Sequence, residues 1–147
     1  MNSPAEKAHA YANDLKMCFF CGILELGSFY LQALVTHAFI LAGTVVIPDS
    51  VVEVDASAFA DCDALETVVL GKKVETVGRH AFSCDEKLKT IYVPKTLKGM
   101  GDNAFYCCDE LSDIYYEGSE ADIAGVTIDV SNLEYIEKAA VYYNHQY

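Results

Sequence analysis

The chain has 147 residues, of which 52% are hydrophobic, and this is enough for one domain with a buried core. Lysine and arginine number 10 against 22 aspartates and glutamates, which gives a formal net charge of −12. An acidic surface without a basic stripe repels phosphate groups, and this argues against nucleic acid and anionic lipid headgroups as partners.

The N-terminal region begins with a predicted helix. Ser3-Pro4-Ala5-Glu6 supplies an N-cap, a proline at the first helical position and a capping-box glutamate, so we expect a helix from residue 4 to about residue 16. Cys18 and Cys21 follow with the spacing of a zinc knuckle or a redox pair. We expect apolar burial for this pair instead, because Phe19-Phe20 separates the cysteines and two further zinc ligands are not nearby. No secretion signal or lipid-attachment motif is visible.

The segment from residue 26 to residue 48 contains no charged side chain. Residues 26–43, about 18 residues, reach the lower limit for a membrane span, whereas residues 44–48 already fit the first repeat strand. His37-Ala38-Phe39 echoes the later His80-Ala81-Phe82, which favours a degenerate first coil or an irregular apolar cap over a span. A start site that is not the natural one, or truncation from a longer repeat array, would produce the same pattern.

A 23-residue repeat extends over residues 44–116. Ala-Phe recurs at Ala58-Phe59, Ala81-Phe82 and Ala104-Phe105, and a framework of apolar positions moves with it. A fixed period of about 20 to 50 residues indicates stacked units, each of which buries its apolar face only against its neighbours. We therefore predict a solenoid in which the small alanine lets the chain pass close by at a corner and the phenylalanine fills the space between coils.

Each unit contains two extended segments. The first alternates inward and outward residues at a period of two, which is typical of a short strand. Its inward positions are Val45 and Ile47, Val68 and Leu70, Ile91 and Val93, and Ile114 and Tyr116. The second segment carries the matching pairs Val51 and Val54, Val74 and Val77, and Leu97 and Met100. It ends in a turn where Gly78 and Gly101, with Asp55 at the same position, are expected to provide positive φ.

The pattern L-x-x-[IV]-x-[IVL]-P-x-x-[VL]-x-x-[VIM]-G-x-x-A-F-x-x-C resembles the Treponema-type leucine-rich repeat of BspA-like bacterial surface proteins. The resemblance covers roughly residues 44–116. The C-terminal segment, with Asn132 and residues 140–144, is similar to the family's ending. Ile123 stands where the family often has tryptophan. The resemblance implies a right-handed solenoid used for protein contacts, often on a cell surface.

The expected fold is therefore mainly β with short helical turns, a right-handed leucine-rich-repeat solenoid of 23-residue coils. Residues 1–43 are expected to form an N-terminal helix and irregular apolar cap, or a degenerate first coil, with the membrane span over residues 26–43 as the alternative. Residues 44–116 form the repeats, and residues 117–147 form a C-terminal β cap.

Four cysteines fall within the repeats. Cys62 and Cys108 come three residues after the repeat phenylalanine, while Asp85 takes this position in the middle unit and Cys84 precedes it. Positions two coils apart lie roughly 10 Å from each other, too far for a disulfide between Cys62 and Cys108. Cys84 lies one coil from Cys62 and from Cys107, where a disulfide is geometrically possible. We nevertheless expect thiols, with the corner cysteines bonding weakly to turn backbone groups as the resemblance implies.

Catalytic or metal-binding patterns are not apparent in the sequence. The acidic loop residues of successive coils could gather calcium, but we favour a solvated loop edge that blocks aggregation; they are Asp61, Asp63, Asp85, Glu86, Asp109 and Glu110. The histidines are scattered, at positions 9, 37, 80 and 145. Phosphate-binding loops, nucleophile elbows and zinc-protease motifs are not found. We predict a protein without catalytic activity, cofactor or metal ion.

The outward positions of the first strand form two rows. One row contains Thr44, Thr67, Thr90 and Asp113, and the adjacent row contains Val46, Val69, Tyr92 and Tyr115. Such rows stabilise neighbouring strands, and tyrosine is also favoured at protein interfaces for its area and its hydroxyl. These residues are the candidate partner-binding surface.

The prediction is a non-enzymatic protein-recognition module that uses this strand face, of the kind found in bacterial surface and adhesion proteins. By resemblance it belongs on the cell surface or outside the cell. The alternative is a structural or self-assembly unit from a longer array. The identity of the protein partner and the oligomeric state stay open.

Overall fold

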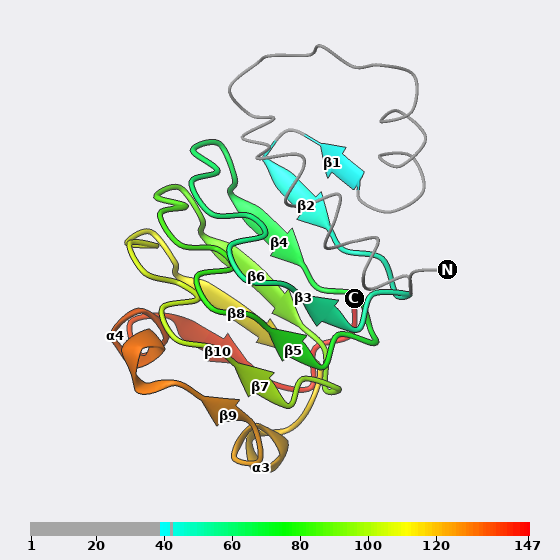
Figure 1. Ribbon diagram of the computed structural model, residues 1–147. Helices are drawn as coiled ribbons and strands as arrows, with labels where there is room; N and C mark the ends of the chain where they lie inside the picture. Colours follow the sequence, from blue (N-terminus) through cyan, green and yellow to red (C-terminus); the bar gives the residue numbers. More distant parts are fainter. Residues whose placement is uncertain (1–38, 42) are drawn as a thin grey trace.

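The computed structural model describes residues 39–41 and 43–147, with side chains from residue 43 onward. Within this part of the chain, the strands stack into two sheets on opposite sides of a solenoid (Figure 1). The six-stranded sheet has the order β1 (Phe39–Leu41), β2 (Thr44–Val46), β4 (Thr67–Val69), β6 (Thr90–Val93), β8 (Asp113–Tyr116) and β10 (Ala140–Tyr142). The four-stranded sheet has the order β3 (Glu53–Val54), β5 (Thr76–Val77), β7 (Gly99–Met100) and β9 (Thr127–Ile128).

Successive coils pair in parallel at the 23-residue step. Thr44 lies opposite Thr67, which lies opposite Thr90, and the register continues to Asp113. Along each strand the predicted inward residues are buried and their neighbours are partly exposed. The sequence prediction of a solenoid with two extended segments per coil is thus confirmed.

The corner between the sheets is held by stacked phenylalanines. The ring centroids of Phe59 and Phe82 lie 5.5 Å apart, and those of Phe82 and Phe105 lie 5.6 Å apart, with nearly parallel planes. The corner backbone also bonds from coil to coil, since Phe59 N–H donates to the Ala81 carbonyl at 2.8 Å and Phe82 N–H to the Ala104 carbonyl at 2.9 Å. The corner is therefore a third line of contact between coils, as the Ala-Phe repeat predicts.

The repeat glycines act through space and not through positive φ. Neither Gly78 nor Gly101 has a positive φ, so that prediction is wrong. A Cβ at Gly78 would lie 2.6 Å from Ala56 N, and a Cβ at Gly101 would lie 2.7 Å from Arg79 N. These glycines are needed because adjacent coils approach too closely for a side chain. The left-handed conformation occurs two residues later, at Ser57, His80 and Asn103, and again at Asp61, Cys84 and Cys107.

The cysteines of the described coils carry thiols, as predicted, and Cys62 and Cys108 are buried. The Cys108 thiol donates to the Phe82 carbonyl at 3.0 Å, so this corner cysteine bonds to the backbone of the preceding coil. Burial raises the pKa of the Cys108 thiol, which keeps it protonated. Cys84 and Cys107 are partly exposed on the same corner.

Asp85 takes the buried cysteine position of the middle coil. Its side chain is fully buried, and Oδ1 accepts a hydrogen bond from Cys62 N–H at 2.7 Å. The other oxygen, Oδ2, has no hydrogen-bond partner among the described residues. Burial raises the pKa of the Asp85 carboxyl from 3.8 to about 8, and the charges of Asp61 and Asp63 act in the same direction. A carboxyl group thus replaces a thiol here and stays protonated at neutral pH.

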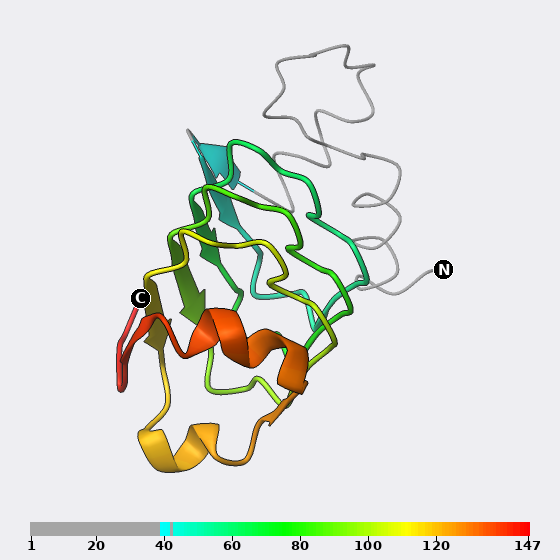
Figure 2. The ribbon, with the colours of Figure 1, turned by 90° about the vertical axis from the view of Figure 1, so that its left-hand side faces the viewer.

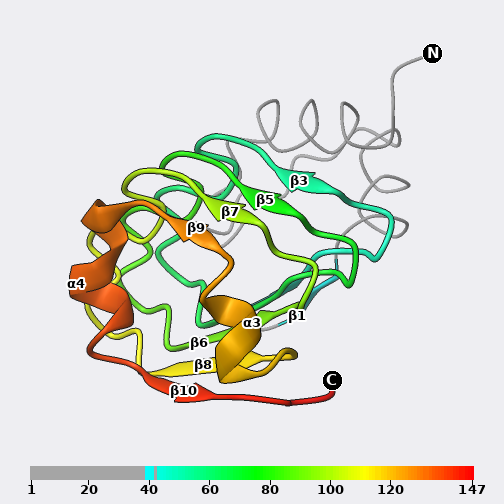
Figure 3. The same ribbon diagram turned by 90° about the horizontal axis from the view of Figure 1, so that it is seen from below.

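The C-terminal segment closes the stack at the end that follows β7 and β8 (Figure 3). It contains α3 (Glu120–Ile123), η2 (Val130–Asn132) and α4 (Leu133–Ile136), and it adds β9 and β10 to the two sheets. Asn132 is fully buried, where its Oδ1 accepts from Phe105 N–H at 3.2 Å and its Nδ2 donates to the Gly101 carbonyl at 2.8 Å. Ser131 Oγ accepts from Asn103 N–H at 2.7 Å. These groups satisfy backbone that bonds to the next coil elsewhere in the stack.

A small apolar cavity lies between the last coils and this cap. It measures about 30 Å³, and Ile123 lines it together with Val126 and Ile128. Ile123 is the position where the related repeats often have tryptophan, so the shorter side chain lies at the wall of an incompletely filled space.

The N-terminal predictions fall mostly outside the described residues. This holds for the helix over residues 4–16, the Cys18 and Cys21 pair, and most of the membrane span over residues 26–43. Among the described residues, no helix is long and apolar enough to cross a membrane. Phe39 lies in β1, which pairs antiparallel with β2, whereas all other pairs in the described sheets are parallel.

The replacement Asn132→Ala is expected to lower the free energy of unfolding by about 2–4 kcal/mol, because it leaves the buried Phe105 N–H and the partly buried Gly101 carbonyl without partners. Urea denaturation followed by circular dichroism measures this loss. Ser131→Ala is the matched control and should cost about 1 kcal/mol, since Ser131 is less buried. Equal effects of the two replacements would contradict the role given to Asn132.

The replacement Asp85→Asn is expected to change the pH dependence of stability. Between about pH 4 and about pH 8 the folded Asp85 carboxyl is protonated and the unfolded one is ionised, so wild-type stability falls as the pH rises through this window. Asparagine keeps an acceptor for Cys62 N–H and does not ionise. The free energy of unfolding of the variant relative to wild type should therefore increase from pH 5 to pH 8, measured by urea denaturation. Asp109→Asn, at an exposed position of the next coil, is the control and should show no such trend. The same relative stability of Asp85→Asn at both pH values would sink this account.

Candidate functional site

The two predicted outward rows lie side by side on the outer face of the six-stranded sheet. Register pairs Val46 with Val69, Val69 with Tyr92, and Tyr92 with Tyr115, and it pairs Thr44 with Thr67, Thr67 with Thr90, and Thr90 with Asp113. The structure therefore brings all eight candidate residues onto one face. That these residues bind a partner stays a prediction.

The aromatic row forms a stack of three tyrosines, which we name the tyrosine ladder: Tyr92, Tyr115 and Tyr142. The ring centroids of Tyr92 and Tyr115 are 4.8 Å apart, and those of Tyr115 and Tyr142 are 4.7 Å apart, with planes within 15° of parallel. Each such pair adds about 0.5–1.5 kcal/mol beyond its buried area. The strand register places the three tyrosines opposite one another, so their rings stack in one continuous row.

Tyr142 is a member of the ladder that the 23-residue search misses. It lies opposite Tyr115, 27 residues away, because the cap inserts extra residues between β8 and β10. Ala140-Val141-Tyr142 repeats the alternation of Asp113-Ile114-Tyr115 and is the signal that could have found it. Tyr142 is 44% exposed and lies at the end of the ladder.

The row beside the ladder is polar. Asp113 accepts a hydrogen bond from the Ser112 hydroxyl at 2.6 Å. A hydrogen bond to Asp113 raises the pKa of the Tyr142 phenol, with the negative charge of Asp113 acting in the same direction. The ladder therefore ends in a bonded pair that crosses from the aromatic row to the polar row.

Charged residues flank both ends of the strands. Lys89 lies 3.8 Å from Glu66 and 3.6 Å from Glu110, and Lys72 lies 3.9 Å from Glu117. Most of these side chains are exposed, so the pairs add little stability, but they set the charge around the face. The face combines an aromatic centre with a charged rim.

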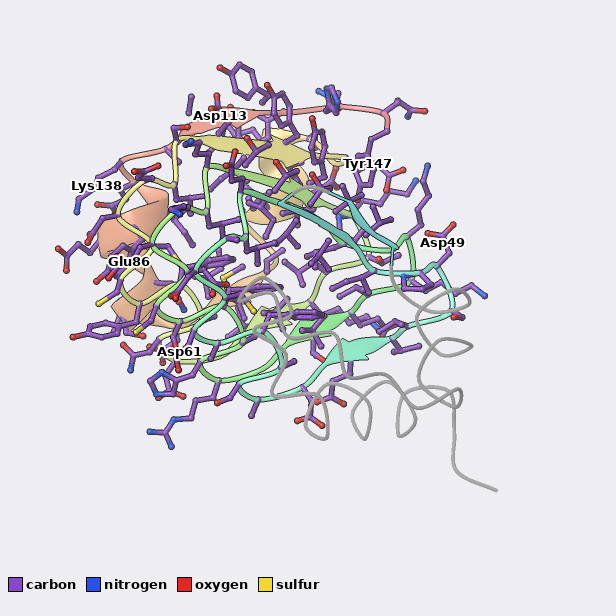
Figure 4. All side chains as sticks on the ribbon, turned by 90° about the horizontal axis from the view of Figure 1, so that it is seen from above. Asp49, Asp61, Glu86, Asp113, Lys138 and Tyr147 are labelled. Atoms are coloured by element: carbon purple, nitrogen blue, oxygen red, sulfur yellow. The ribbon has the colours of Figure 1, made fainter. Side chains whose placement is uncertain are left out.

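The C-terminal residues His145 and Tyr147 also lie on this face, and sequence reasoning missed both. Figure 2 shows the segment after β10 rising along the outer side of the six-stranded sheet. In Figure 4, Tyr147 and Asp113 project on the same side of the molecule, away from Asp61 and Glu86 on the loop edge. No periodic pattern in the sequence marks a segment that crosses the strands.

The acidic loops do not form a metal site in the described part of the chain. There, no three histidine, cysteine, aspartate or glutamate side chains are arranged to hold a metal ion. The outer face of the six-stranded sheet is therefore the candidate site that geometry supports.

Comparison with protein families identifies the repeats that build this architecture. A model of the BspA type leucine-rich repeat region, in six copies, matches residues 41–144. The chain belongs to the BspA-type leucine-rich repeat family. The match includes β9 and β10, which extend the two sheets beyond the 23-residue units.

Two solved structures are similar to this BspA-type chain. The Treponema pallidum leucine-rich repeat protein is 27% identical, with a TM-score of 0.48 over 69% of this chain and 52% of that protein's chain. A leucine-rich cell surface protein of Faecalibacterium prausnitzii is 19% identical, with a TM-score of 0.38 over 59% of this chain and 35% of that one. The present chain thus spans about half the length of the Treponema protein. No curated protein matches the sequence.

Proposed function

We propose that this BspA-type chain is a protein-recognition module whose contact surface is the outer face of the six-stranded sheet. The observation that carries the proposal is the tyrosine ladder, in which stacked rings are held by strand register and remain partly exposed. Tyrosine offers a large contact area with few rotatable bonds and a hydroxyl for hydrogen bonding, so a preformed row loses little entropy on binding. The charged rim supports specificity and not affinity.

A place on the cell surface is part of the proposal. Its support is membership in the BspA-type family and the similarity to a protein described as a leucine-rich cell surface protein. An adhesion role would use the same sheet face for a protein outside the cell.

The replacement Tyr115→Ala tests the recognition surface. Peptides are first selected from a displayed library for binding to the immobilised wild-type chain. Their affinity for the Tyr115→Ala variant should be at least about tenfold lower, since the central ring of the ladder contacts both neighbours. Tyr106→Ala is the matched control, because Tyr106 is a 47% exposed tyrosine on the corner. Surface plasmon resonance measures both, and circular dichroism verifies the fold. Binders that tolerate Tyr115→Ala but not Tyr106→Ala would overturn the assignment.

Self-assembly through the end of the stack is the second candidate. Val130 and Leu133 are 78% and 38% exposed there, close in sequence to the edge strand β9. Exposed apolar residues beside strand edges favour association. In this case the molar mass from light scattering would rise with concentration, and Tyr115→Ala would leave that rise unchanged.

A further inference from the structure

The segment that follows β10 turns onto the outer face of the six-stranded sheet. Asn144 adopts a left-handed conformation with φ of 57°, which asparagine tolerates better than most residues. Asn144 N–H donates to the Gly118 carbonyl at 2.9 Å, and His145 N–H donates to the Tyr116 carbonyl at 3.1 Å. The backbone is thus fixed at the end of β8, and the side chains beyond it cross the strands.

Residues 145–147, which we name the tail, lie against the tyrosine ladder. The His145 ring lies 4.6 Å from Tyr115 and 5.7 Å from Tyr92, centroid to centroid. The Tyr147 ring lies 5.3 Å from Tyr92, with the Lys72 ammonium 5.5 Å from its centroid. Burial raises the pKa of the Tyr147 phenol. The tail therefore occupies part of the surface proposed for recognition.

The Tyr147 hydroxyl replaces a missing backbone donor in the coil-to-coil hydrogen bonds. It donates to the Leu70 carbonyl at 3.0 Å. In the next coil, the equivalent Val93 carbonyl accepts from Glu117 N–H at 2.9 Å. For the Leu70 carbonyl, the residue that corresponds to Glu117 is Pro94, which has no backbone N–H to donate. Because a buried carbonyl needs a donor, the phenol supplies what Pro94 lacks.

From these contacts we infer that the tyrosine ladder, the Leu70 carbonyl and Lys72 form a docking site for an extended protein segment that carries a tyrosine. The tail occupies this site in the free chain, and a partner segment competes with it. The inference rests on the proposed function and specifies the chemistry of the partner. The phenol ring packs on Tyr92 under the Lys72 ammonium, and its hydroxyl donates to Leu70, as Tyr147 does.

A weak tail is sufficient for self-occupancy. Attachment to β10 gives the tail an effective concentration on the order of millimolar at the site. A partner segment with additional contacts to the polar row can therefore displace it, whereas a short free peptide binds measurably only when the tail is disabled.

The test uses the full chain with both His145→Ala and Tyr147→Ala, which we name the open variant, and a synthetic peptide with the sequence of residues 142–147. Amide NMR signals of residues 71, 72, 92 and 115 should shift in the open variant and return toward their wild-type positions as peptide is added. Wild-type protein should bind the peptide at least about tenfold more weakly, because its own tail competes. A peptide with phenylalanine at the last position should bind the open variant roughly threefold to tenfold more weakly, since it lacks the hydroxyl.

Tyr147→Phe in the full chain keeps the ring and removes only the hydroxyl, so it tests the same contact if the open variant is poorly folded. It should bind the peptide more tightly than wild type does. Unchanged signals of the open variant during the titration, or equal affinity of the tyrosine and phenylalanine peptides, would overturn the inference. If the peptide fails while selected binders still require Tyr115, the proposed function stands and only this inference falls. If the peptide binds while selected binders ignore Tyr115, the site serves the tail alone and the proposed function falls.

Discussion

The structure depends on the hydrogen bonds that each coil makes to the next at a fixed 23-residue step. These bonds run through both sheets and also through the corner, where Ser57 and Phe59 donate to the following coil just as His80 and Phe82 do. One register therefore places like residues above like residues all round the coil. The phenylalanine stack, the apolar interior and the Tyr92–Tyr115 pair of the tyrosine ladder are three consequences of that single constraint, whereas Tyr142 joins the ladder through the register of β10 with β8.

The repeated part of the fold could be predicted because its determinants are local and periodic. The inward and outward rows follow from the strand alternation, and the buried thiol positions follow from the step. The role of Gly78 was misjudged because close approach between coils and positive φ both select glycine, and the sequence does not separate them. Tyr142 and Tyr147 were missed for another reason, since the cap breaks the step and the tail crosses the strands instead of joining them.

Departures from the repeat mark the places where this chain differs from a uniform stack. Asp85 puts a protonated carboxyl where Cys62 and Cys108 put thiols, and the buried amide of Asn132 ends the row of coil-to-coil hydrogen bonds at the Ala-Phe corner. Pro94 removes one donor, and the freed Leu70 carbonyl becomes a point of recognition for a phenol. The regular coils thus form the continuous stack, whereas the irregular residues add to it a carboxyl group, an amide and a backbone carbonyl without a backbone donor.

Amide hydrogen–deuterium exchange in the corners tests the continuity of the coil-to-coil bonds most directly. Loop amides ordinarily exchange quickly, but Phe82 N–H and Cys84 N–H donate to the next coil at 2.9 and 2.7 Å. We predict that these two amides are protected as strongly as those of β4 and β6, and that they exchange only when the central coils unfold together. Rapid exchange at Phe82 and Cys84 while the strands stay protected would contradict the account.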